Sequence, residues 1–209
     1  TDSTDNVCTA CPVGEYSDDD SYAPCKPCDP ASKLFQDKTG QSACQTCSQC
    51  GAGFGQTQAC TADTDTVCTA CVAGTVSPGS SYDSCERCDS TTQVFQDQAG
   101  QSSCTPASEG HFVDKPRATG EEECSKGEYA SGSGNKACTQ CDAGRFAGST
   151  GMGNCDLAGE GHYVPDSGAD EQEKCEPGTY ASGRGATSCT EANSGYFVED
   201  EGAKRQDKC

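Results

Sequence analysis

Apolar side chains are sparse along the chain and follow no helical period. No stretch repeats apolar residues every three to four positions, and Gly, Ser, Thr and Asp are dense throughout. We therefore expect no helix longer than a turn or two. The pattern instead predicts a small, disulfide-rich and mostly irregular fold with short two-stranded β-ribbons.

The apolar positions recur at fixed distances from cysteines. In one unit, Gly lies three positions after a Cys, an aromatic residue or Val lies five after it, and a second Cys lies fourteen after it. The glycine suits a backbone that turns with positive φ, and the ring is large enough to cover the disulfide. The unit occurs at Cys11 to Cys25, Cys71 to Cys85, Cys124 to Cys138, Cys141 to Cys155 and Cys175 to Cys189.

Longer spans of 20 residues join cysteines in the second half of the chain. Each has Gly six positions after the first Cys, an aromatic residue at the eighth and Val at the ninth. We expect these spans to be strand-like connectors between the closed loops. They are Cys104 to Cys124, Cys155 to Cys175 and Cys189 to Cys209.

A larger duplication lies over these units. Residues 7–44 realign with residues 67–104 without a gap. A dense run of cysteines extends from the end of the first copy to the start of the second, and this run is the centre of the pattern. Its members are Cys44, Cys47, Cys50, Cys60 and Cys68.

Composition without cysteine would place the chain among disordered proteins. Leu, Ile, Val and Phe make up 17 of 209 residues, Trp is absent and the formal net charge is -19. This is too little apolar area to offset the entropy lost on ordering. The 20 cysteines indicate a disulfide scaffold. Because disulfides persist in oxidising compartments, we expect an extracellular protein, secreted or at the cell surface.

Charge and motifs narrow the partners. The acidic balance disfavours nucleic acid and heparin-like polyanions, and Lys204-Arg205 is the basic pair that stands out. No apolar run approaches the roughly 18 residues of a membrane span. The start TDSTDN lacks signal-peptide features, so we expect a processed chain or a segment of a longer one. The expected partners are proteins, through self-association or with other extracellular proteins, and the abundant Ser and Thr leave O-glycans open.

At the central run the chain resembles the tumour necrosis factor receptor cysteine-rich domain. CDPASKLFQDKTGQSACQTCSQCGAGFGQTQACTADTDTVC has the single loop, the crossed pair and the DTVC ending, Asp65 to Cys68, of that family. The flanking CxxGxY units, with FQDxxGQSxC at Phe35 to Cys44 and Phe95 to Cys104, resemble ephrin-receptor-like repeats. The resemblance implies a fold of the growth-factor-receptor cysteine-rich superfamily. It transfers no ligand contacts, because no motif for them matches.

These resemblances predict four segments in an elongated tandem-repeat rod, in which each unit is stabilised by its own cross-link and its neighbours. The segments are residues 1–27, the end of a preceding unit and the first loop; 28–70, the tumour necrosis factor receptor-like domain; 71–123, the duplicated loop pair and a spacer; and 124–209, the ephrin-receptor-like repeats.

The repeat restricts a disulfide pairing that sequence does not determine in general. If each unit with cysteines fourteen positions apart closes on itself, its two cysteines pair, and the related loops from Cys28 and Cys88 follow. The four cysteines left in the central run are paired crosswise, as in the family that this block resembles. The predicted bonds are Cys11–Cys25, Cys28–Cys44, Cys47–Cys60, Cys50–Cys68, Cys71–Cys85, Cys88–Cys104, Cys124–Cys138, Cys141–Cys155 and Cys175–Cys189.

Two cysteines are left over. Cys8 corresponds to Cys68 when the two copies of the duplication are aligned, so its partner would precede residue 1. Cys209 ends one of the longer spans and is expected to open a further loop. The alternative is a head-to-tail bond between Cys8 of one subunit and Cys209 of another.

Candidate chemistry is weak. CxxC pairs such as Cys25-Cys28 have zinc-ligand spacing, but later units lose the second CxxC and keep the fourteen-position spacing, which favours loop closure over a zinc or redox site. His111 and His162 fill a slot that holds Tyr196 in a third copy, which favours a structural ring. The runs Asp18-Asp19-Asp20 and Glu121-Glu122-Glu123 lack calcium-loop spacing, which favours a solvated acidic face.

Two functions stay open. The first is a structural segment of a longer secreted or cell-surface chain, acting as a stalk, a matrix component or a subunit of an extracellular filament. The second is the ligand-binding ectodomain of a receptor. No set of Ser, His and Asp or paired carboxylates indicates a catalytic geometry, so we expect no enzyme activity and no cofactor.

Overall fold

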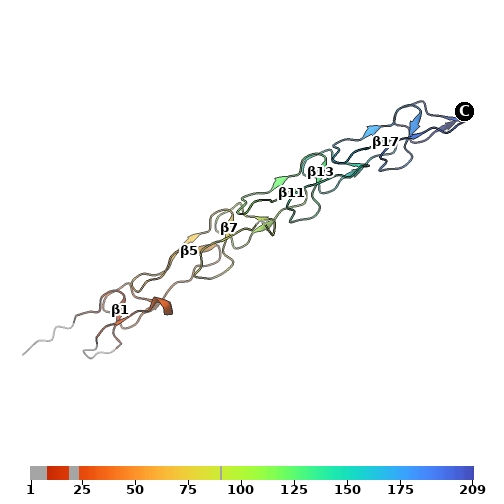
Figure 1. The fold of residues 1–209 in the computed structure, drawn as a ribbon. Coiled ribbons are helices and arrows are strands. Elements are labelled where there is room, and N and C mark those ends of the chain that lie inside the picture. The colour runs from red at the N-terminus through yellow and green to blue at the C-terminus, as the bar shows by residue number, and fades with distance from the viewer. Residues whose placement is uncertain (1–8, 19–23, 90) are drawn as a thin grey trace, which may run out of the picture. The chain divides into compact units, whose positions relative to one another are not determined.

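Two-stranded antiparallel ribbons are the repeating element of the protein. The computed structural model describes residues 9–18, 24–89 and 91–209, and each strand in them pairs with one other strand (Figure 1). The helical structure of these residues is one 3-10 turn, η1 (Pro30–Ser32), and the Asp29 side chain accepts a hydrogen bond from the N–H of Ala31 at its start. The predicted fold class is confirmed, as is the lack of a long helix.

Most of the described ribbons pair two residues with two. A residue with positive φ precedes each first strand, Lys33 or Gln93 in two ribbons and glycine in the others, and a cysteine or an alanine directly follows the second strand. The ribbon of β5 and β6 is longer and has a β-bulge between Gln56 and Gln58. The pairs are β1 (Glu15–Tyr16) with β2 (Lys26–Pro27), β3 (Leu34–Phe35) with β4 (Gln45–Thr46), β5 (Phe54–Gln58) with β6 (Val67–Ala70), β7 (Thr75–Val76) with β8 (Glu86–Arg87), β9 (Val94–Phe95) with β10 (Thr105–Pro106), β11 (His111–Phe112) with β12 (Glu122–Glu123), β13 (Glu128–Tyr129) with β14 (Thr139–Gln140), β15 (Arg145–Phe146) with β16 (Asp156–Leu157), β17 (His162–Tyr163) with β18 (Glu173–Lys174), β19 (Thr179–Tyr180) with β20 (Thr190–Glu191), and β21 (Tyr196–Phe197) with β22 (Asp207–Lys208).

The contacts of the chain divide it into two compact units. Unit 1 comprises the described residues of Thr1–Arg87 together with Gln98–Ser103. Unit 2 comprises the described residues of Cys88–Asp97 together with Cys104–Cys209. Unit 1 therefore holds the ribbons from β1 to β8, and unit 2 holds those from β9 to β22. The four segments read from the sequence are a finer division, which stays a prediction.

Unit 2 is built from loops of constant length, as the even spacing of Gly110, Gly127 and Gly144 shows. The N–H of each such glycine donates to a carbonyl of the following loop, for example from Gly110 to Ala130 at 2.8 Å. Its carbonyl accepts from an N–H at the end of its own loop, for example from Cys124 at 2.9 Å. Each loop is thus closed by one backbone bond and joined to its successor by another, as in solenoid repeats.

The three spans that the sequence analysis treats as connectors fold in fact as loops of this same kind. β11 pairs with β12 as β13 pairs with β14 in the next loop, and β17–β18 and β21–β22 repeat the arrangement. The expectation of connectors between closed loops is therefore wrong. That expectation rests on the cysteine positions alone, whereas the glycine turns and the backbone hydrogen bonds set the loop conformation.

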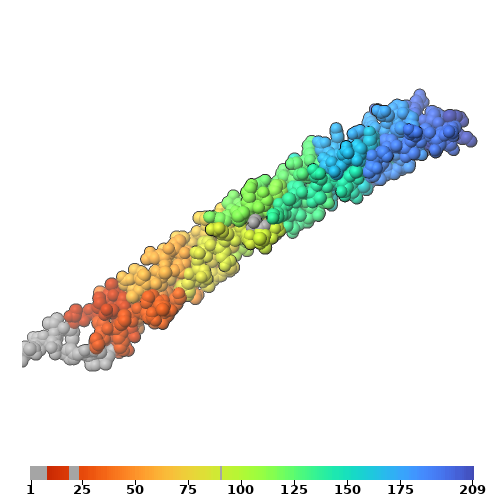
Figure 2. Space-filling view, in the orientation of Figure 1, coloured from red at the N-terminus to blue at the C-terminus, as the bar shows by residue number. Residues whose placement is uncertain are grey.

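The core of each unit is thin and consists largely of half-cystines with Ala and Val. In unit 2, Cys124, Cys141, Cys175 and Val164 have no exposed surface. The ring of Tyr129 packs on the cluster of Cys141, Ala147 and Cys155, which belongs to the following loop. An aromatic ring here covers the disulfide of the next loop. In the space-filling view, successive loops of unit 2 occupy successive sections of that unit (Figure 2, green to blue).

Candidate functional site

Glycines bring loops of unit 2 into direct backbone contact. Gly110 has φ of +81°, and a Cβ added there would overlap the backbone carbonyl of Gly151. Only a residue without a side chain fits at such a position. The same close approach joins Gly127 to Gly168, Gly144 to Gly185, and Gly161 to Gly202. We call these glycine pairs the stacking contacts. They recur along unit 2 and are made by backbone atoms, so they require no particular neighbouring side chain.

Nine disulfide bonds close loops in the described residues. Their Cα atoms lie between 5.5 and 6.1 Å apart, as ordinary disulfides require. The pairs coincide with the pairing read from the sequence. Cys8 lies outside the described residues, and Cys209 is exposed and free. The bonds are Cys11–Cys25, Cys28–Cys44, Cys47–Cys60, Cys50–Cys68, Cys71–Cys85, Cys88–Cys104, Cys124–Cys138, Cys141–Cys155 and Cys175–Cys189.

In three loops a hydrogen bond takes the place of the disulfide. Where other loops have Cys at both ends, these have Ala at the first position and Glu or Gln at the second. The Glu121 carboxylate accepts hydrogen bonds from the backbone N–H and the hydroxyl of Ser108, both at 2.6 Å. In the other two loops the bonds run from the N–H of Gly159 to Oε1 of Gln172 at 2.6 Å and from the N–H of Asn193 to Oε1 of Gln206 at 2.7 Å.

We call Glu121, Gln172 and Gln206 the closing side chains. Each binds the N–H that follows Ala107, Ala158 or Ala192, so the ends of the loop are joined where a disulfide would join them. A hydrogen bond of this type contributes about 1 kcal/mol, against about 3 kcal/mol for a disulfide that closes a loop of this length. These loops are therefore the more weakly closed members of unit 2.

Glu121 is the one closing side chain that titrates. Partial burial raises the pKa of its carboxyl, but the hydrogen bonds from Ser108 and the nearby His111 outweigh that effect. The net pKa of Glu121 lies below its ordinary value. The closing bond of this loop therefore depends on pH, whereas the amides of Gln172 and Gln206 do not titrate.

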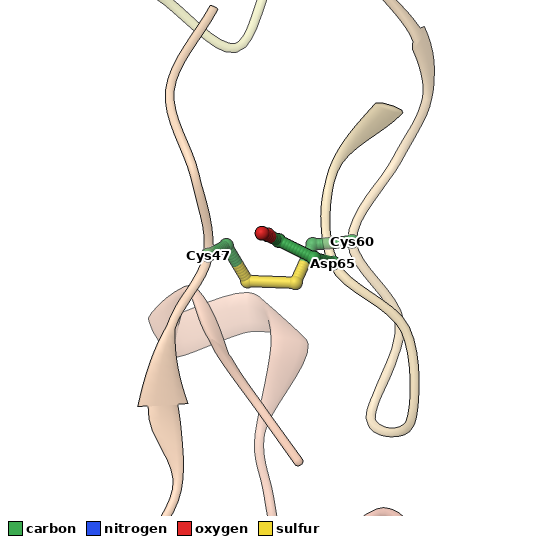
Figure 3. A group of neighbouring side chains, drawn as sticks. All are labelled: Cys47, Cys60 and Asp65. Carbon is green, nitrogen blue, oxygen red and sulfur yellow. A yellow bond between two sulfur atoms is a disulfide. The ribbon is translucent and has the colours of Figure 1, made fainter. Parts of the chain in front are cut away.

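The described residues contain one group whose ligand atoms come close enough for a metal ion, namely Cys47, Cys60 and Asp65 (Figure 3). The two sulfur atoms are bonded to each other and are not free thiolates. Burial raises the pKa of Asp65, but hydrogen bonds from Ser48 and Thr66 outweigh it and leave the pKa below its ordinary value. The carboxylate is thus already bound by the N–H and hydroxyl of Ser48, at 2.7 and 2.6 Å. The bonds between Asp65 and Ser48 therefore join the same two segments as the Cys47–Cys60 disulfide.

The histidines and the described residues of the acidic runs contact partners close to them in the sequence. Nδ1 of His111 lies 3.1 Å from the carbonyl oxygen of Glu109, and Nδ1 of His162 lies 3.1 Å from that of Glu160, so each ring is held by its own loop. Within the run at residues 121–123, Glu122 pairs with Lys115 at 3.1 Å and Glu123 lies 3.8 Å from His111, while Glu121 binds Ser108. Asp18 pairs with Lys26 at 2.7 Å, and residues 19 and 20 lie outside the described residues.

Unit 1 exposes three large apolar side chains in or next to its longest ribbon. Phe54, Val67 and Val72 are 45, 45 and 58% exposed. A shallow hollow of about 260 Å³ lies between the strand residues of β5–β6 and the loop from Val72 to Cys85. No helix in the described part of the chain is long and apolar enough to cross a membrane.

Comparison with known proteins finds a similarity in the central block. Residues 30–68 match the TNFR/NGFR cysteine-rich region. This stretch contains β3 to β5, the crossed bonds Cys47–Cys60 and Cys50–Cys68, and the start of β6. A search of curated proteins found no match. The tandem disulfides and the matched region define an extracellular or cell-surface cysteine-rich module.

The closing side chains are the functional residues that sequence reasoning missed. A signal for them was present, because Gly110, Gly127, Gly144 and Gly161 are evenly spaced. A fourteen-position cysteine span and a twenty-position span together cover 34 positions, which is twice the glycine spacing of 17. A search keyed to glycine in place of cysteine would have placed Ala107 and Glu121 in the positions of paired cysteines.

Proposed function

We propose that the protein is a structural extracellular repeat segment that acts as a spacer and keeps other extracellular parts apart. The observation that supports this most is the stacking contact, which recurs at an even spacing from Gly110 to Gly161. A loop that contacts a later loop through backbone atoms can be repeated many times with little demand on side chains. The role would be that of a stalk, a matrix component or a filament subunit.

Charge and composition support the same proposal. A net charge of -19 makes the segments of the chain repel each other, which favours an extended over a collapsed arrangement. The partners would be proteins, either further copies of this chain or other extracellular proteins, with O-glycans on exposed Ser and Thr. The protein would have no enzyme activity, because the closing side chains and the histidines are engaged within their own loops.

Small-angle scattering and electron microscopy of the native protein test the proposal. An extended particle of constant width is expected at neutral pH, and it should persist at high salt because backbone bonds and disulfides, rather than repulsion alone, maintain it. The matched control is the reduced and alkylated chain, which should scatter as a flexible coil. A compact globular particle from the oxidised protein would overturn the proposal.

A receptor ectodomain is the second candidate function. The match to the TNFR/NGFR cysteine-rich region and the exposed Phe54, Val67 and Val72 favour it. The double variant Phe54→Asp and Val72→Asp should then abolish binding of a protein ligand, while the particle dimensions stay unchanged. Sequence beyond both ends also separates the candidates, since a membrane span with a cytoplasmic signalling region favours a receptor and further repeats favour a spacer.

We also propose that the loops outside the matched block are ephrin-receptor-like repeats. The common CxxGxY start, as at Cys11 and Cys124, supports this relationship. The four segments at residues 1–27, 28–70, 71–123 and 124–209 follow from it. Limited proteolysis and mass mapping of the unreduced protein test both the segments and the nine disulfide pairs.

A further inference from the structure

One loop of unit 2 combines exposure with weak closure. Residues 114–117, with the sequence DKPR, are all exposed. They belong to the loop that Glu121 closes by hydrogen bonds to Ser108 in place of a disulfide. The chain from Phe112 to Glu122 surrounds a hollow of about 400 Å³, so this segment has little packing on its inner side. Such a segment opens at low cost, because few contacts are lost.

Arg117 has a backbone conformation that favours glycine. Its φ is +59°, and the corresponding position of each of the following five loops holds glycine. An L-residue with a side chain is strained in this region. Among the described residues, two backbone hydrogen bonds involve positions 117 and 118. The N–H of Arg117 donates to the carbonyl of Cys88, and the N–H of Gln96 donates to the carbonyl of Ala118. Only these two backbone bonds oppose the opening of the segment around Arg117. The glycines are Gly134, Gly151, Gly168, Gly185 and Gly202.

The position of the basic residues decides where a cut would separate the chain. Six basic residues lie inside disulfide-closed loops, so a cut there leaves the two parts joined; they are Lys33, Lys38, Lys126, Lys136, Arg145 and Arg184. Lys115 precedes Pro116, a bond that trypsin-like enzymes cleave poorly. Other basic residues outside closed loops are held in ribbons, namely Lys26 in β2, Arg87 in β8, Lys174 in β18 and Lys208 in β22.

Arg117 and the pair Lys204-Arg205 remain, and both lie in loops without a disulfide. Both arginines are exposed, and 85% of the Arg205 side chain is accessible. Its loop, however, has Gly202 at the position that Arg117 occupies, and so lacks the strained residue. Recognition requires several residues of the substrate to become extended in the enzyme, and the strained, poorly packed segment around Arg117 meets that requirement at lower cost.

We propose that the Arg117–Ala118 bond is a processing site for an arginine-specific, trypsin-like endopeptidase. The enzyme would hydrolyse the peptide C–N bond with one water molecule. Arg117 becomes a C-terminal carboxylate and Ala118 a new N-terminus. Because no disulfide spans this bond, cleavage divides the covalent chain between Cys104 and Cys124 and leaves the nine closed loops intact. This inference is independent of the proposed spacer function.

N-terminal mapping of the protein isolated from its natural source is the decisive experiment. A population of chains that begins at Ala118, with the sequence ATGEEEC, is expected. Limited digestion of the intact folded protein with trypsin is the companion measurement, with the first cut expected after Arg117 and two fragments that separate without reducing agent. Native chains that are all intact across residues 117 and 118, or a first cut elsewhere, would overturn the proposal.

Variants locate the cause of the cleavage. In Ala107→Cys with Glu121→Cys, a disulfide should slow the cut by about tenfold or more and hold the fragments together until reduction. Arg117→Gln should abolish the first cut, and the matched control Arg205→Gln should leave its rate unchanged. If Arg205→Gln slows the first cut and Arg117→Gln does not, the site is at Arg205 and the proposal fails.

Discussion

Neighbouring loops of unit 2 reach one conformation by two kinds of closure. The loop from Cys124 is closed by a disulfide to Cys138, and the loop before it is closed by Glu121 on the N–H of Ser108. Both have the two-residue ribbon and the glycine turn, and in both the glycine N–H donates to the next loop at 2.8 to 2.9 Å. The disulfide therefore stabilises the loop but does not determine its shape.

The difference between the two kinds of loop is therefore one of local stability. A disulfide restricts the unfolded chain whether or not the loop is folded, whereas the carboxylate or amide bond exists only in the folded loop. Strong and weak closures both occur along unit 2, and the segments expected to open most easily are Ala107–Glu121, Ala158–Gln172 and Ala192–Gln206. The predictions below separate what the backbone contacts contribute from what the closures contribute.

The largest effect is expected at a stacking contact. Gly110→Ala introduces a methyl group into the carbonyl of Gly151 at a φ of +81°, and should cost about 3 kcal/mol or more in the free energy of loop opening. Hydrogen exchange of the neighbouring amides measures this cost. The matched control is Gly178→Ala, where φ is +88° and no atom lies within 4 Å of the added methyl, so strain alone should cost about 1 kcal/mol. Equal costs at both positions would contradict a role for the contact.

The second prediction exchanges one closure for the other. Cys141→Ala with Cys155→Ala should lower the free energy of unfolding by about 3 kcal/mol, since it removes the cross-link that closes this loop. Cys141→Ala with Cys155→Gln should recover about 1 kcal/mol, because the amide is placed to accept from the N–H of residue 142 as Gln172 accepts from Gly159. Urea unfolding of both variants makes the measurement. A Gln variant no more stable than the Ala variant would show that the closing bond needs more than its two end residues.

The third prediction concerns pH. Because the pKa of folded Glu121 lies below the ordinary value of 4.5, its contribution is fully present above that value and is lost as the pH falls through the folded pKa. Exchange of the Ser108 N–H, corrected for intrinsic rates, should therefore accelerate in acid. The N–H of Gly159, which is bound by Gln172, is the internal control and should show no such step. Glu121→Gln should remove the step, and its persistence in that variant would assign it to another group.

The smallest effect is expected at Arg117. Arg117→Gly relieves a φ of +59° at a position where the five following loops have glycine, and the gain exceeds the entropy that glycine adds to the unfolded chain. The loop should be stabilised by about 0.5–1 kcal/mol. Gly134→Ala makes the reverse change in the next loop, at a φ of +73° and with no close neighbour, and should destabilise it by a similar amount. Thermal unfolding of the two variants should show shifts of opposite sign.

Much of this architecture was predictable because loop closure depends on short sequence spacings. Cysteines fourteen positions apart with a glycine three positions after the first, as at Cys11 and Cys25, are enough to predict a closed loop with a turn. The ribbons and the absence of a long helix in the described residues also follow from local composition. The crossed bonds of the central run needed the family resemblance, since Cys47, Cys50, Cys60 and Cys68 can pair in three ways.

The sequence by itself determined the class of protein, a chain of short cysteine-closed ribbons with too little apolar area to form a large core. Only the tertiary structure decided that the Glu121 carboxylate binds the N–H and the hydroxyl of Ser108, and that Gly110 meets Gly151 in a later loop. The reason is physical. Loop closure acts between residues that are a short, fixed number of positions apart in the sequence. The stacking contacts instead depend on how one folded loop lies on the loops that follow it, which no local pattern specifies.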